Sequence, residues 1–109
     1  MNRPFTPDPK GVTYRNRALL DLMAKAPHCM RCSTPQVGQV VGAHRNGGLV
    51  WGRGLGHKCH DLPAALCFEC HSLIDSNLLS AEESDREWLK AAVKTWLWLM
   101  QSGHLKVVP

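Results

Sequence analysis

Two pairs of cysteines, Cys29 with Cys32 and Cys67 with Cys70, constrain the fold of this chain more than any other feature. Two residues separate the cysteines of each pair, a spacing that places both thiols on one tight turn. Two such turns that meet in space supply the four sulfur ligands of a closed tetrahedral zinc site. The sequence therefore predicts a structural zinc ion held by Cys29, Cys32, Cys67 and Cys70, which would stabilise a small fold.

The alternative for these cysteines is a pair of disulfides, which would require an oxidising compartment. Residues 1–5 contain no apolar signal stretch, so we expect a reducing, cytoplasmic setting. No apolar run reaches the roughly 18–20 residues that span a bilayer, and we expect no membrane contact. The fifth cysteine, Cys59, is expected to be either a spare ligand or an ordinary loop thiol.

The 109 residues are expected to form one domain with three parts. Residues 1–13 carry three prolines and a glycine, and they are predicted to form a flexible arm. Residues 14–79 are predicted to form the core together with an N-terminal helix, and residues 80–109 a C-terminal packing helix and tail. The net charge of +4 favours a polyanionic partner.

Hydrophobic periodicity predicts three helices and two strands. The core elements are expected to be a helix over 14–25 that ends before Pro27, strands over 37–43 and 62–66, and a helix from Cys67 to about Ser76. The final helix is expected to begin with a capping box formed by Ser80 and Glu83 and to end near Gly103.

The final helix carries a wide apolar face that we expect to pack on the core. This face comprises Trp88, Leu89, Ala92, Val93, Trp96, Leu97 and Met100. Trp98 falls off that face. It is expected to mark either a contact in a homodimer formed through this helix or an isolated exposed side chain.

A loop between Arg45 and Lys58 contains five glycines and several cations. Glycine allows a backbone to approach a phosphate chain closely, and cations attract it. The loop is therefore a candidate DNA contact through Arg45, Asn46, Arg53 and Lys58. A flexible surface loop without a ligand is the alternative.

The order of the motifs resembles that of HNH, or ββα-metal, endonucleases, and more narrowly that of a family of small phage and prophage nucleases. The matching motifs are Cys29-x-x-Cys32, Ala43-His44-x-Asn46, Gly54-x-Gly56-x-Lys58-x-x-Asp61 and Cys67-x-x-Cys70-His71-x-x-Ile74-Asp75. The resemblance spans roughly residues 19–75. It implies an α+β fold with a small zinc-stabilised treble-clef core, flanking N- and C-terminal helices, and a location in the cytoplasm of a bacterial host cell.

The resemblance also implies roles for single residues. His44 matches the general base that removes a proton from water, a task that suits the near-neutral pKa of histidine. His71 and Asp75 match the ligands of a catalytic divalent ion, and the carboxylate favours magnesium or manganese over zinc. Asp61 would orient His44 or join the metal ligands. Many HNH sites carry a metal ligand just before the base, where this chain has Ala43.

The sequence thus favours a metal-dependent DNA endonuclease acting in phage recombination, replication or packaging. Two alternatives stay open. One is a noncatalytic zinc module that binds nucleic acid, and the other is a zinc-stabilised module for protein interaction that uses Trp98 and the final helix. The pairing of His44 with His71 places the endonuclease first, because a four-cysteine zinc site needs neither histidine.

Overall fold

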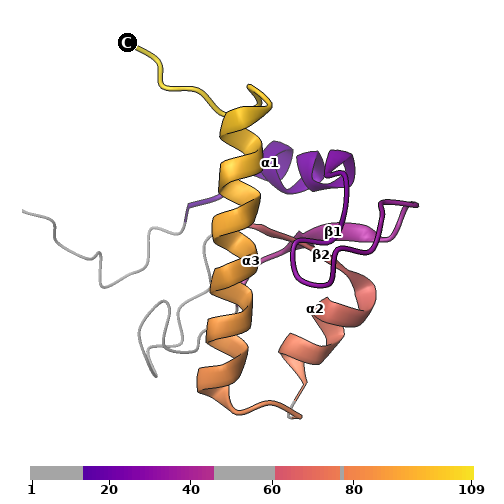
Figure 1. Ribbon diagram of the computed structural model, residues 1–109. Helices are drawn as coiled ribbons and strands as arrows, with labels where there is room; N and C mark the ends of the chain where they lie inside the picture. The colour runs from indigo at the N-terminus through magenta and orange to yellow at the C-terminus, as the bar shows by residue number, and fades with distance from the viewer. Residues whose placement is uncertain (1–13, 46–60, 77) are drawn as a thin grey trace, which may run out of the picture.

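The computed structural model describes residues 14–45, 61–76 and 78–109, which form a small α+β fold (Figure 1). In chain order the elements are helix α1 (Arg17–Leu22), the 3-10 turn η1 (Met23–Lys25), strands β1 (Val40–Ala43) and β2 (Ala64–Cys67), and helices α2 (Phe68–Asp75) and α3 (Ala81–Gln101). Figure 1 shows α3 running along one side of the molecule, with α1, the strands and α2 arranged beside it. The predicted α+β class is confirmed.

The two strands pair antiparallel, with Val40 opposite Cys67 and Ala43 opposite Ala64. The first strand starts three residues later than predicted, because the Gln36 side chain accepts the backbone N–H groups of residues 38–40 and holds them in a turn. Helix α1 packs closely on β1 at Gly42. A Cβ atom at that position would lie 3.0 Å from the Leu20 carbonyl oxygen, so a larger residue would need α1 to move away by a few tenths of an ångström.

The helix boundaries follow from their caps. Asn16 caps α1 by accepting the Leu19 N–H, so the helix starts later than the predicted residue 14. The 3-10 turn η1 then continues to Lys25, the predicted end. The predicted capping box at the start of α3 is confirmed, since Ser80 and Glu83 each accept the other's backbone N–H.

The prediction for the inner face of α3 is partly wrong. Trp88 and Ala92 are buried as expected, but four large apolar residues assigned to the core are 43–60% exposed: Leu89, Val93, Leu97 and Met100. The buried side is formed instead by a set that is rich in small and polar residues: Ser84, Asp85, Trp88, Ala91, Ala92, Thr95 and Leu99.

Small residues face inward because α3 packs tightly against the free edge of β2. The Thr95 hydroxyl accepts the Ala65 N–H at 2.9 Å and donates to the Ala91 carbonyl at 2.7 Å. On the same residue of β2, the Ala65 carbonyl accepts the Met30 N–H at 2.9 Å. The helix and the cysteine-bearing turn therefore supply hydrogen bonds that the two-stranded sheet cannot make for itself.

Replacing Thr95 by valine keeps the shape of this side chain and removes its hydroxyl. Thr95 is fully buried, so the Ala65 N–H would lose its partner without gaining water. We expect the variant to lose about 1–3 kcal/mol of unfolding free energy, measured by urea denaturation. Thr95→Ser, which keeps the hydroxyl, serves as the control. A Thr95→Val protein as stable as the wild type would contradict this description of the β2 edge.

Candidate functional site

The four paired cysteines form one cluster, as the sequence predicts. Cys29 and Cys32 lie on the turn after η1, Cys67 ends β2, and Cys70 lies in the first turn of α2. Their sulfur atoms all lie within 4.8 Å of one another, and all four are free thiols. A group with this composition and spacing can hold a single metal ion.

Hydrogen bonds shape the first cysteine turn. The Cys29 N–H donates to the Thr34 carbonyl at 2.8 Å, and the Ser33 N–H donates to the Cys29 carbonyl at 3.0 Å. Ser33 adopts a left-handed conformation with φ of 66°, which reverses the chain. The bond from Met30 to the β2 backbone then fixes this turn against the strand that ends in Cys67.

The sulfur geometry fits a tetrahedral thiolate site. A metal–sulfur bond of about 2.3 Å in a regular tetrahedron places the sulfurs about 3.8 Å apart, and Cys32 Sγ lies 3.7 Å from Cys67 Sγ. Backbone N–H groups also point at the sulfurs. Cys29 Sγ accepts from Arg31 and Cys32 at 3.4 and 3.5 Å, and Cys67 Sγ accepts from Cys70 at 3.5 Å. These donors stabilise sulfur as an anion, which is the form that binds metal.

The protein environment separates the acidities of these thiols. Hydrogen bonds from Thr34 lower the pKa of Cys32 to about 6, whereas burial raises the pKa of Cys70 to about 12. Burial also raises the pKa of Cys67. A bound cation must therefore displace protons from the buried thiols, which makes retention of a metal dependent on pH.

The candidate base, His44, directly follows β1 and is half-buried. Both of its neighbours are anchored to α3. The Trp88 indole N–H donates to the Ala43 carbonyl at 2.9 Å, and Arg45 Nε lies 2.7 Å from Asp85 Oδ1. The position of His44 therefore depends on a helix that lies outside the motifs on which the resemblance rests.

The sequence predicts no role for Asp85, and it predicts only core packing for Trp88. An aspartate on the inner side of an amphipathic helix was the available signal, because a buried carboxylate needs a charged or hydrogen-bonding partner. That partner is Arg45, which the sequence predicts as a DNA contact. Both side chains of the pair are about nine-tenths buried, so little of the Arg45 guanidinium is available to a phosphate.

Asp61 is buried at the start of the segment that leads into β2. Its Oδ2 accepts the Asn16 N–H at 2.9 Å, and its Oδ1 lies 3.1 Å from Arg15 Nη1. The Asn16 N–H and then Arg15 lower the pKa of Asp61, and His44 makes a smaller contribution. Asp61 thus lies near enough to His44 to interact electrostatically, while both of its carboxylate oxygens bind the entry to α1.

His71 and Asp75 lie on one face of α2, as their spacing predicts. His71 Nε2 is 2.9 Å from Asp75 Oδ2, and both side chains are partly exposed. Within the described ranges, the four cysteines are the only group of three or more His, Cys, Asp and Glu residues that could share an ion. The structure therefore does not gather His44 or Asp61 with His71 and Asp75 into a three-ligand group.

Several residues assigned from the sequence lie outside the described residues. These are the candidate DNA contacts Asn46, Arg53 and Lys58, the fifth cysteine Cys59, and the N-terminal arm over 1–13.

Comparison of the chain with protein-family models, with curated proteins and with solved structures gives no match. Among the described residues, no helix has the length and apolar character needed to cross a membrane.

The contacts of Asp61 predict a change in stability with pH. Because the folded state lowers the pKa of Asp61, its stabilising contribution is present above the ordinary value of 3.8 and is lost as the pH falls through the lower folded value. We expect Asp61→Asn to cost about 1–3 kcal/mol at pH 7, measured by urea denaturation. The difference between the two proteins should shrink as the pH falls below 3.8. An equal difference at every pH would contradict the assignment.

Proposed function

We propose that this chain is a metal-dependent DNA endonuclease of HNH type whose core is stabilised by a structural zinc ion. The main support for this proposal is the order of a cysteine turn, two antiparallel strands and a helix. His44 follows the first strand, and His71 and Asp75 lie on the helix. That order supports a treble-clef core of the ββα-metal type. The cluster of four free thiols supports the zinc assignment, because soft thiolate ligands favour zinc over magnesium or calcium.

The proposed roles follow the chemistry of the side chains. His44 accepts a proton from the attacking water, and its half-buried position leaves part of the ring accessible. His71 and Asp75 hold the catalytic ion, magnesium or manganese. When bound, that ion supplies electrostatic stabilisation of the charge that develops at the scissile phosphate. Two protein ligands are enough for magnesium, which usually keeps several waters and binds substrate phosphates directly.

Asp61 and the two anchors from α3 act on His44 without touching the substrate. The Asp61 carboxylate lies near enough to His44 to interact with it electrostatically, and its own position is fixed by Asn16 and Arg15. Trp88 and Asp85 hold the residues on either side of His44. The base is therefore supported by the segment before α1 and by α3.

A noncatalytic module that binds nucleic acid is the nearest alternative. The net charge of +4 suits both functions, and Ala43 stands where many HNH enzymes carry a metal ligand. A cleavage assay distinguishes the two functions, because only the endonuclease cuts DNA and requires His44 to do so.

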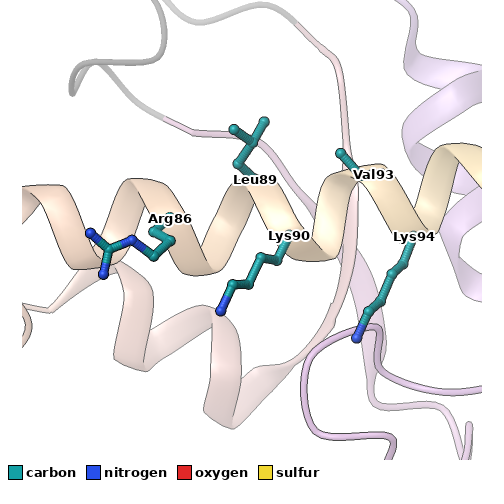
Figure 2. Close-up of a pocket in the computed structure, with 5 residues that line it drawn as sticks. All are labelled: Arg86, Leu89, Lys90, Val93 and Lys94. Atoms are coloured by element: carbon teal, nitrogen blue, oxygen red, sulfur yellow. The ribbon is translucent and has the colours of Figure 1, made fainter.

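The outer face of α3 favours protein interaction as a second candidate function. Leu89 and Val93 lie beside a row of cations formed by Arg86, Lys90 and Lys94, which project along one side of the helix (Figure 2). The exposed residues Leu89 and Val93 therefore replace Trp98 as the candidate dimer contact. Trp98 is partly buried against the core, and its ring centroid lies 5.4 Å from that of His104.

The endonuclease proposal predicts nicking of supercoiled plasmid in magnesium or manganese and none in EDTA. His44→Ala should lower the cleavage rate at least about a hundredfold, in the range of a lost general base. His71→Ala should also lower it strongly, because it removes a proposed ligand of the catalytic ion. His104→Ala, which removes an exposed histidine near the C-terminus, should cleave like the wild type. Equal cleavage by all four proteins would indicate contamination. Salt-sensitive DNA binding without cleavage by the wild type would favour the noncatalytic alternative.

The homodimer proposal predicts that sedimentation equilibrium finds a dimer of the wild type and a monomer of Val93→Glu. Val93 is exposed, so the substitution should weaken association through a buried charge while hardly changing the stability of one chain. Val107→Glu, which alters an exposed valine in the C-terminal tail, is the matched control. A monomeric wild type would contradict self-association through α3.

A further inference from the structure

Arg31 lies inside the first cysteine pair, and its side chain connects three parts of the fold. Its Nη1 atom lies 3.5 Å from Cys70 Sγ on α2, and its Nε donates to Glu87 Oε1 on α3 at 3.0 Å. Lys90 Nζ lies 3.6 Å from the other oxygen of Glu87. A chain of sulfur, guanidinium and carboxylate groups thus runs from the cysteine cluster to α3.

Each of the four sulfurs has a hydrogen-bond partner, and these partners differ in kind. Backbone N–H groups donate to Cys29 and Cys67, and the Thr34 hydroxyl lies 2.9 Å from Cys32 Sγ. Of the four cysteines, only Cys70 has a charged side-chain group among the described residues, the Arg31 guanidinium, as its hydrogen-bond partner. Four thiolates around a divalent ion have a net charge of −2, so a fixed cation beside the buried Cys70 sulfur stabilises the loaded site.

The geometry of the guanidinium suits this double contact. Its planar group directs N–H bonds to two acceptors at once, whereas a lysine ammonium acts as a single flexible point charge. The Arg31 and Glu87 side chains are 28% and 27% exposed, so water screens their interaction only in part.

We propose that Arg31 is a positioning residue of the metal centre, that it holds the Cys70 thiolate, and that Glu87 holds Arg31 in place. Retention of the metal and docking of α3 at Glu87 then depend on each other. This inference rests on the proposed zinc site and does not depend on nuclease activity. Groups that orient metal ligands commonly change metal affinity by about 10- to 100-fold.

The test measures zinc release from the full-length protein to a chromogenic chelator at fixed pH. Arg31→Gln should release zinc about 10- to 100-fold faster than the wild type. Arg31→Lys keeps the charge and loses the double contact. This variant and Glu87→Gln should release zinc at rates between those of the wild type and Arg31→Gln. Arg17→Gln and Glu82→Gln make the same charge changes at exposed positions and should match the wild type.

Cobalt substitution distinguishes a local effect from a misfolded variant, because the sulfur-to-cobalt absorption bands report a four-thiolate site. Arg31→Gln should show these bands and still lose the metal faster. Release from Arg31→Gln at the wild-type rate would overturn the inference while leaving the zinc site intact. A wild-type protein that binds no zinc would overturn the zinc site and the inference together. If Arg31→Gln does not form the four-thiolate site, Arg31→Lys and Glu87→Gln carry the test, and release from both at the wild-type rate would overturn the inference.

Discussion

Four thiols from three separate elements converge at one point of this small fold. Cys29 and Cys32 come from a turn, Cys67 from the end of β2 and Cys70 from the start of α2. The sheet between them has only two strands in the described part of the chain, and a two-stranded hairpin is marginally stable by itself. A metal ion bound by the four cysteines would join the turn, the strand and the helix at one point and so define how they pack.

Helix α3 completes this small core and reaches the candidate site at several places. Thr95 satisfies the edge of β2, Trp88 and Asp85 hold the residues around His44, and Glu87 reaches Arg31 beside the cysteines. The helix therefore does more than cover apolar surface. It connects the cysteine cluster, the strand pair and the candidate base.

Features set by local spacing could be predicted from the sequence. The two cysteine turns, the capping box of α3 and the facing of His71 and Asp75 each depend on residues three or four positions apart. The inner face of α3 could not be predicted in the same way. Hydrophobicity predicts that Leu89 and Val93 face the core. The small side chains of β2 instead let α3 approach closely, and the small residues Ala91 and Thr95 face the strand.

Contacts between residues far apart in the sequence could not be predicted either. Arg45 and Asp85 are 40 positions apart. The positive charge of Arg45 predicts a phosphate contact, but in the fold Arg45 pairs with the buried carboxylate of Asp85.

Zinc K-edge X-ray absorption of the purified full-length protein would identify the ligands of the cysteine cluster. The zinc assignment predicts one zinc per chain, with four sulfur neighbours at about 2.3 Å. A shell in which nitrogen or oxygen replaces two of the sulfurs, or a protein isolated without metal and with paired disulfides, would contradict it.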